Sequence, residues 1–256
     1  MTDLEPSHEV TVDDVLDRYI QRVFAPSDAL LSELLAEAER AGFPIIAIYP
    51  QEAKIVQVLL RSIQARKVVE VGTCFGYGAI WLARALPSTG TLYTIEKNPE
   101  FQALARKYVE RAGLSDRVDF RLGEAQQVFP ELTGEAIDAV FIDANWDEYP
   151  AYLEWALSVL RPGGLIISHN AHFFGFVVLD PNSEDFAGDL ARLSDEAAAS
   201  YEARDTAGKA EFLRALRAIR NFNQQLASDP RLTSVLIPTT EGLSVAVVNH
   251  QDARHG

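Results

Sequence analysis

The chain has only one cysteine and one methionine among its 256 residues. The single cysteine, Cys74, excludes an internal disulfide and a cysteine-rich zinc site, and it is typical of a protein in a reducing compartment. Basic residues are also scarce, because 23 Lys and Arg stand against 37 Asp and Glu, for a net charge of -14. A surface with this charge repels phosphate backbones, so we expect no nucleic-acid partner.

Long apolar runs are missing as well. No stretch approaches the roughly 18 apolar residues that a membrane-spanning helix needs, so we expect no membrane partner. The acidic start MTDLEPSHEVTVDD has no apolar segment of the kind found in signal peptides, and we expect a cytoplasmic protein. Hydrophobic residues nevertheless make up 48% of the chain, which is ample for the core of one large α/β domain.

Helical patterns dominate the first quarter of the chain. After a loose tail over residues 1–10, the apolar spacing predicts three helices that form a helical N-terminal extension over residues 11–66. The first begins at a capping Thr11. The second runs from a capping Ser27 to Gly42, and the third begins at Pro50.

From Lys67 onward, short β-branched runs alternate with helical patterns. This alternation predicts a parallel sheet with helices on both of its faces. Strands are expected over residues 67–72, 91–98, 117–123, 137–144 and 163–170, and an antiparallel pair over 234–249. We therefore expect a single domain, 1–256, with a cofactor-binding core over 67–170 and a final helix and hairpin over 221–250.

The segment between these parts, residues 171–220, is rich in alanine and acidic residues and is expected to be partly helical. Two interpretations stay open. The segment is either a surface insertion or a lid over the substrate.

Small and acidic residues follow the predicted parallel strands. Gly72, Gly76 and Gly78 come after the first strand in the order GxxxGxG, which differs from the GxGxxG of dinucleotide sites. Glu96 ends the next strand, where an acid can accept hydrogen bonds from ribose hydroxyls. Gly123 and Ala125 follow the third strand and suit an adenine edge, and Asp143 ends the fourth strand. Each feature alone is an ordinary turn or a solvated carboxylate, but together they predict a nucleoside site with few phosphate contacts.

The chain also resembles a known family, through stretches such as VVEVGTCFGYGAIWLARALP, YTIEKNPEFQALARKYVERAGLSDRV and VFIDANWDEYPAYLEWALSVLRPGGLI. From about residue 12 to 249 it is similar to class I S-adenosylmethionine-dependent O-methyltransferases of the catechol and caffeoyl-CoA type. The resemblance implies a Rossmann-like sandwich with a seven-stranded, mostly parallel sheet whose last strand is antiparallel. It also implies a homodimer. The cofactor-binding residues that it implies are Ile48, Glu70, Gly72, Thr73, Gly76, Tyr77, Gly78, Glu96, Lys97, Gly123, Ala125, Asp143 and Tyr149.

The sequence differs from the resembled family at the positions that carry out the reaction there. There, three oxygen ligands hold Mg²⁺ or a similar ion: the Asp143 position and an Asp-Asn pair after the next strand. A lysine three residues after the first aspartate assists as a base. This chain has His169-Asn170 in place of the pair, and Trp146 in place of the lysine. A tryptophan cannot accept a proton.

Three interpretations of this change stay open. In the first, Asp143, His169 and Asn170 hold an ion, and Mn²⁺ or Zn²⁺ suits such a set better than Mg²⁺. In the second, no metal binds and His169 or His172 is the general base beside Asp143. In the third, both histidines lack a chemical role.

Aromatic residues gather in the same part of the sequence. Trp146, Phe173 and Phe174 predict an aromatic wall for a planar acceptor, to which Tyr49 and Asn221 are added as substrate contacts. We therefore predict an enzyme that transfers a methyl group from S-adenosylmethionine to a hydroxyl of a small aromatic molecule. The alternatives are a metal-independent O- or N-methyltransferase with a histidine base, and a protein that binds the cofactor without catalysis.

Overall fold

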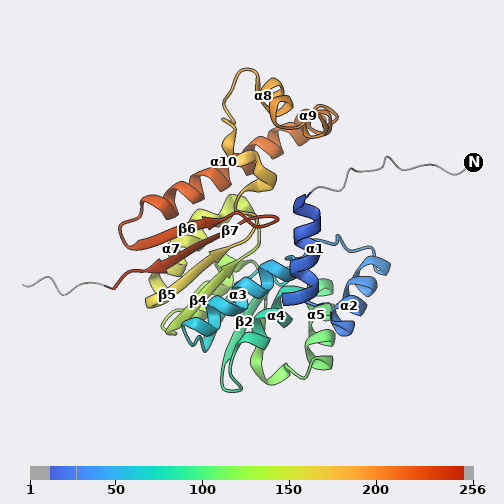
Figure 1. The fold of residues 1–256 in the computed structure, drawn as a ribbon. Helices are drawn as coiled ribbons and strands as arrows, with labels where there is room; N and C mark the ends of the chain where they lie inside the picture. Colours follow the sequence, from blue (N-terminus) through green and yellow to red (C-terminus); the bar gives the residue numbers. More distant parts are fainter. Residues whose placement is uncertain (1–11, 27, 251–256) are drawn as a thin grey trace, which may run out of the picture.

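The computed structural model describes residues 12–26 and 28–250, and within them one seven-stranded sheet (Figure 1). Its order is β3-β2-β1-β4-β5-β7-β6. Strands β1 to β5 are parallel, β7 is antiparallel to β5, and β6 is antiparallel to β7, which confirms the predicted sheet. The strands are β1 (Lys67–Val71), β2 (Thr91–Glu96), β3 (Val118–Leu122), β4 (Ile137–Ile142), β5 (Leu160–Ser168), β6 (Leu232–Ile237) and β7 (Leu243–Val248).

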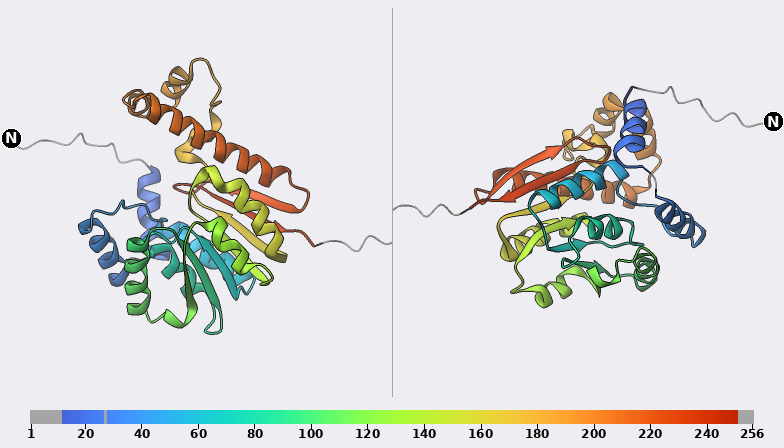
Figure 2. Two further views of the ribbon diagram at one scale, coloured as in Figure 1. Left: turned by 180° about the vertical axis from the view of Figure 1, so that it is seen from behind. Right: turned by 60° about the horizontal axis from the view of Figure 1, so that its bottom comes forward.

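Helices cover both faces of the sheet, as Figure 2 shows from two further directions. Alternate strand residues enter opposite cores: Val68 joins the core under one set of helices, whereas Val69 and Val71 join the other. The first core is shared by α2 (Ala29–Arg40), α3 (Pro50–Ser62), α4 (Tyr77–Ala85) and α5 (Pro99–Arg111). The second packs against α6 (Ala125–Val128), η2 (Phe129–Leu132), α7 (Tyr149–Val159) and the C-terminal half of α10 (Thr206–Ser228).

The predicted N-terminal helices are present, with one change at a cap. Helix α1 (Val12–Phe24) packs against α3, and Pro50 occupies the first position of α3. The side chain of Asp28 caps α2, because it accepts hydrogen bonds from the N–H groups of Leu30 and Leu31 at 2.8 and 3.3 Å. The two capping residues that the sequence suggested, Thr11 and Ser27, lie outside the described residues.

The segment after β5 forms a small helical layer with a core of its own. It contains η4 (Phe173–Val178), α8 (Phe186–Leu193), α9 (Asp195–Glu202) and the first half of α10, which enclose Leu190, Leu216 and Ile219. In Figure 1 these helices stand away from the sheet. Helix α10 runs unbroken across residue 220, so the boundary expected there falls inside a helix. Within residues 12–26 and 28–250, no helix is both long and apolar enough to cross a membrane.

The turn after β1 brings two strand ends into direct contact. Gly72 has a φ of 102°, and a Cβ atom there would lie 2.0 Å from the carbonyl oxygen of Asp143. Strands β1 and β4 are parallel neighbours, so their carboxyl ends meet at this point. Only glycine allows both the left-handed backbone and the close approach.

We predict that Gly72→Ala lowers the free energy of unfolding by more than about 2 kcal/mol, because the new methyl group overlaps the β4 backbone. Urea denaturation would measure this. Gly113→Ala is the matched control, because Gly113 has a φ of 68° and no heavy atom within 4 Å of the added Cβ. Its cost should be limited to the strain of a left-handed residue, about 1 kcal/mol. Equal losses in the two variants would contradict the steric argument.

Candidate active site

A cavity of about 960 Å³ opens at the carboxyl ends of β1, β4 and β5. The backbone brings these ends into line, because Asp143 N–H donates to Val71 O at 2.9 Å and His169 N–H donates to Ile142 O at 3.0 Å. The cavity gathers twelve residues expected at the site: Ile48, Tyr49, Glu70, Gly72, Thr73, Tyr77, Gly78, Asp143, Trp146, His169, Asn170 and Phe174. Helix α1 adds Arg18 and Arg22, which the sequence analysis did not single out.

Several expected cofactor contacts lie beside this cavity and do not line it. The Glu96 carboxylate accepts hydrogen bonds from the N–H groups of Cys74 and Asn98, both at 2.8 Å, which fixes it next to the turn after β1. Each of its oxygens keeps a lone pair for a further donor. Gly123 donates its N–H to Glu96 O, so the end of β3 adjoins the same carboxylate residue. Gly76 packs against Ala105. Lys97 is exposed and pairs with Glu124 at 3.6 Å.

The floor of the cavity is acidic. Glu70 is fully buried, and a Cβ atom on Gly78 would lie 2.7 Å from its Oε1, so Gly78 leaves the carboxyl group accessible from above. Burial, together with the negative charges of Asp143 and Glu96, raises the pKa of Glu70 to about 8. An incoming cation would lower that pKa, so this end of the cavity favours a positively charged ligand.

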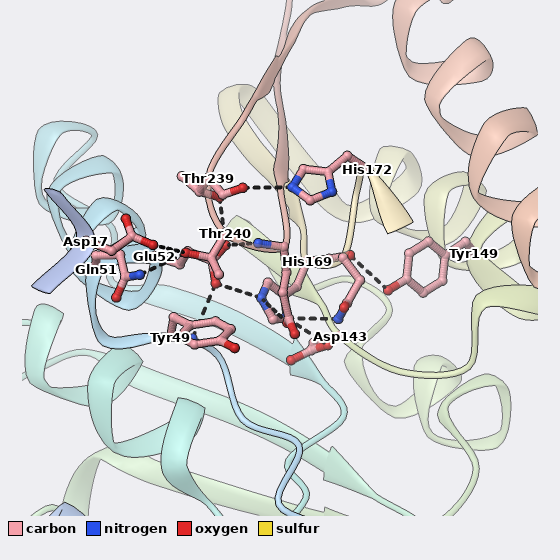
Figure 3. Close-up of polar contacts among 12 residues, drawn as sticks. Asp17, Tyr49, Gln51, Glu52, Asp143, Tyr149, His169, His172, Thr239 and Thr240 are labelled. Carbon is pink, nitrogen blue, oxygen red and sulfur yellow. Dashed lines mark hydrogen bonds and ion pairs between the residues drawn. The ribbon is translucent and has the colours of Figure 1, made fainter. Parts of the chain in front are cut away.

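The side chain of His169 lies among three carboxylates (Figure 3). Its Nε2 is 3.0 Å from Glu52 Oε2 and 3.2 Å from Glu241 Oε2, while its Nδ1 is 3.3 Å from Asp143 Oδ1. Only 2% of the His169 side chain is exposed. Because both ring nitrogens face carboxylate oxygens, both are placed as N–H donors, which is the imidazolium form.

The charge balance around His169 supports this form. Burial, the largest influence, lowers the pKa of His169, but the carboxylates of Asp143 and Glu52 together outweigh it and raise the pKa to about 10. The amide nitrogen of Asn170 lies 3.1 Å from Nδ1. The nitrogen and oxygen of an amide are assigned from their hydrogen-bond partners, so a protonated Nδ1 calls for the Asn170 oxygen at this position.

The Glu52 carboxylate accepts hydrogen bonds from His169 and from three other donors. Its Oε2 accepts from His169 Nε2 at 3.0 Å and from Tyr49 N–H at 3.3 Å. Its Oε1 accepts from the Thr239 hydroxyl at 2.7 Å and from Glu241 N–H at 2.8 Å. A carboxylate has about four lone-pair sites, so none remains free on Glu52.

These contacts decide how well a divalent metal fits. Among the described residues, the group of His, Cys and acidic side chains that could hold an ion is Glu52, His169 and Glu241, which lies on the opposite edge of the ring from Asp143 and Asn170. An ion there would have to displace the Nε2 proton and break a hydrogen bond to Glu52. On the Asp143 side, an imidazole nitrogen replaces the hard carboxylate that Mg²⁺ prefers. The residues therefore do not fit the metal that the resemblance implies.

His172 has a different environment from His169, and it does not line the cavity. Its Nε2 lies 2.7 Å from Thr239 O, and its Nδ1 accepts from Gly175 N–H at 3.0 Å. Both nitrogens are thus engaged with backbone in a neutral ring, so the geometry assigns His172 a structural role at the start of η4 and not that of a base.

Two other expected contacts also lie away from the cavity. Tyr149 is buried in the core beneath the site, where its hydroxyl donates to His169 O at 3.4 Å. Asn221 is exposed on α10 and lines neither cavity described for this protein. The neighbouring Asn223 faces inward instead, and its amide donates to Ala171 O at 2.6 Å.

Aromatic side chains border the cavity beside His169. Trp146, Phe174 and Tyr49 line it, and Phe173 lies behind Trp146 with the two ring centroids 5.1 Å apart. Three of the expected aromatic residues therefore face the cavity, and the fourth supports them.

Sequence reasoning missed Glu52 and Glu241, the two acids at Nε2. Glu52 lies in the stretch IIAIYPQEAKIV, which carries part of the family resemblance, and Glu241 lies in the turn of the predicted hairpin. No spacing rule connects them with His169, because Glu52 lies 117 residues before His169 and Glu241 lies 189 residues after Glu52.

Comparison with known proteins identifies the class of protein to which this chain belongs. The sequence profile of the O-methyltransferase family matches residues 22–248, and the chain belongs to that family. Catechol O-methyltransferase of Niastella koreensis is 41% identical over 181 residues, covering 69% of this chain and 81% of that protein. Catechol O-methyltransferase of Mycobacterium tuberculosis is 35% identical over 170 residues, covering 66% and 77%.

Solved structures agree and identify the cofactor. The O-methyltransferase of Bacillus cereus in complex with S-adenosylhomocysteine superimposes with a TM-score of 0.75 at 32% identity, covering 92% of this chain and 97% of that one. The O-methyltransferase TomG of Streptomyces achromogenes, in complex with S-adenosylmethionine, gives 0.74 at 29% identity, covering 92% and 96%. This protein is an S-adenosylmethionine-dependent O-methyltransferase, and the acidic floor suits the cationic sulfonium of that cofactor.

We predict that Glu52→Gln lowers the free energy of unfolding by about 3–5 kcal/mol near neutral pH. The substitution breaks a buried ion pair and leaves the His169 imidazolium without the carboxylate of residue 52. Urea denaturation followed by circular dichroism would measure the loss. Glu33→Gln is the control, since Glu33 pairs with Arg111 on the surface and should matter little.

The same pair predicts a pH dependence. The pKa of His169 rises from its ordinary value of 6.5 to about 10 on folding, so its stabilising contribution is fully present below pH 6.5 and is lost as the pH rises through 10. The difference in unfolding free energy between the wild type and Glu52→Gln should therefore shrink between pH 7 and pH 10. A difference that stays constant over that range would show that His169 is neutral in the folded protein.

Proposed function

We propose that this enzyme methylates a hydroxyl group on the aromatic ring of a small acceptor, and that the His169 imidazolium supplies the positive charge at the reaction centre. The observation that carries the proposal is the placement of the His169 ring between the carboxylates of Asp143, Glu52 and Glu241, at the wall of a cavity lined by Trp146 and Phe174. The catechol O-methyltransferases among its relatives support an acceptor of this chemistry.

The cavity supports the proposed acceptor in two ways. Its aromatic border offers flat apolar surfaces to a ring. Polar groups that could contact a hydroxyl are grouped at one place in its wall, where Asp143 and Asn170 lie next to His169. A phenolic acceptor bound between these surfaces would place its hydroxyl at Asp143 and its ring against Trp146 or Phe174.

The chemistry follows from these positions. S-adenosylmethionine supplies a methyl group on a sulfonium, and one C–S bond breaks as the new O–C bond forms. Asp143 accepts the hydroxyl proton, and its partly exposed carboxylate passes that proton to solvent. The imidazolium of His169 stabilises the negative charge that develops on the acceptor oxygen. The aromatic border excludes water and orients the ring for in-line transfer.

The proposed centre works without a divalent ion. We predict that transfer of a labelled methyl group from S-adenosylmethionine to catechol proceeds in the presence of EDTA, at a rate within about twofold of the rate in its absence. Mg²⁺, Mn²⁺ and Zn²⁺ would then be added singly after metal removal. A stimulation of tenfold or more by any one of them would overturn the proposed role of His169.

We predict that His169→Gln lowers kcat by about 10²-fold or more, because a neutral amide cannot offset the developing negative charge. His172→Gln is the matched control and should leave kcat within a few-fold of the wild type. Circular dichroism and S-adenosylmethionine binding would check that each variant is folded.

The wild-type pH profile provides a test that needs no variant. The turnover number should fall as the pH passes about 10 and His169 loses its proton. A kcat that stays on a plateau well above pH 10, in a protein that remains folded, would contradict the imidazolium role.

Two broader expectations stay predictions. A homodimer is implied by resemblance, and a cytoplasmic location follows from composition. Helix α1 exposes Val15, Leu16, Tyr19 and Val23, an apolar strip that is compatible with a contact between subunits.

A further inference from the structure

A second cavity of about 330 Å³ lies within the helical layer formed by η4, α8, α9 and α10. Most of its wall is aromatic, and its size falls within the range of about 300–1,000 Å³ that small-molecule sites occupy. Aromatic residues in its wall are Trp146, Phe173, Phe174, Phe176, Tyr201 and Phe212.

The two cavities share a wall. Trp146 and Phe174 line both of them. Phe174 is 58% exposed, which is a large exposed fraction for an apolar side chain of this size. A ligand that reaches past these two side chains would pass from the reaction centre into the helical layer.

The backbone at this wall has an uncommon conformation. Phe173, Phe174 and Gly175 all have positive φ angles, of 46°, 54° and 86°. Bulky residues rarely adopt this conformation, and residues that do so are concentrated at ligand-binding sites. The bend sends Phe173 inward against Trp146, Phe176 and Phe212, while Phe174 stays at the surface between the cavities.

The chemistry of the second cavity favours an aromatic ring. The Phe212 ring is only half-buried, and its centroid lies 5.7 Å from that of Phe176 and 5.5 Å from that of Tyr201. These distances are typical of paired aromatic rings, so a further ring could join the cluster in the same manner. The charged residues in the wall, Arg204 and Glu211, are exposed and opposite in sign, and they give no reason for a strongly charged ligand.

We propose that the second cavity binds the distal aromatic ring of a two-ring acceptor whose hydroxyl-bearing ring lies at Asp143 and His169. This inference rests on the proposed function, which supplies the position of the reacting ring. Trp146 and Phe174 then form the passage between two subsites, and the helical layer determines which acceptors bind well.

The first test compares catechol with 4-phenylcatechol, which has the same reacting group and one additional ring. Calorimetric titration in the presence of S-adenosylhomocysteine measures binding without any turnover. We expect the two-ring ligand to bind about tenfold more tightly or better, from burial of the second ring. Equal affinity for the two ligands would overturn the second subsite.

Variants that fill the second cavity locate the extra ring. Ala197 and Ser200 line the cavity on α9, whereas Ala199 is exposed on the same helix outside it. Ala197→Phe and Ser200→Trp should each weaken 4-phenylcatechol binding about tenfold and leave catechol within twofold. Ala199→Phe should change neither. If both filling variants, shown to be folded, weaken the two ligands equally or leave both unchanged, the extra ring binds elsewhere.

Turnover separates this inference from the function on which it rests. With both proposals correct, 4-phenylcatechol has the higher kcat/KM through a lower KM, and Ala197→Phe removes that advantage. Methylation of neither ligand would refute the proposed function, while the binding comparison would still decide the subsite.

Discussion

The contact between Glu52 and His169 is the interaction around which the proposed reaction centre is organised. It buries a carboxylate and an imidazole together, 0% and 2% exposed, where neither charge would be tolerated alone. Through it, the first turn of α3, the end of β5 and the turn between β6 and β7 are fixed relative to one another. The positions of Asp143 and Glu241 follow, because each lies against the same ring. Loss of this pair would therefore disturb both the N-terminal extension and the C-terminal hairpin.

The site has two halves that are built in different ways. The half expected to bind the cofactor is assembled from successive strand ends, where Gly72 allows close approach and Glu96 accepts a hydrogen bond from the N–H of Cys74 in the turn. The reaction half depends on contacts between distant segments. In the proposed mechanism, the His169 side chain carries the positive charge that a metal ion supplies in the site implied by the sequence resemblance. In electrostatic terms, each of these two arrangements would place a cation beside the acceptor oxygen.

Much of the fold could be predicted from sequence because its signals are local. The β-branched runs mark the strands, and glycine or asparagine marks their ends, so the sheet and its antiparallel edge were foreseen. The cap of α2 was placed one residue early because serine and aspartate are nearly equivalent there, and Asp28 has the geometry that the cap needs. Trp146 and Phe174 were also foreseen as cavity residues, because Trp146 replaces the lysine of the resembled family and Phe174 belongs to the aromatic stretch after β5.

The reaction centre could be predicted only in part, since its partners are not encoded by spacing. His169 was singled out because it replaces an expected acid, but its protonation depends on Glu52, which lies 117 residues earlier. His172 appeared equivalent in sequence, yet Thr239 and Gly175 engage its ring. Such assignments follow from tertiary contacts alone.

The same tertiary contacts determine how much of the chain must be synthesised before the proposed reaction centre can form. The strands that build the cofactor half leave the ribosome first, whereas Thr239 and Glu241 arrive with the last hairpin, so a nascent chain can form its cofactor site before it can form its reaction centre.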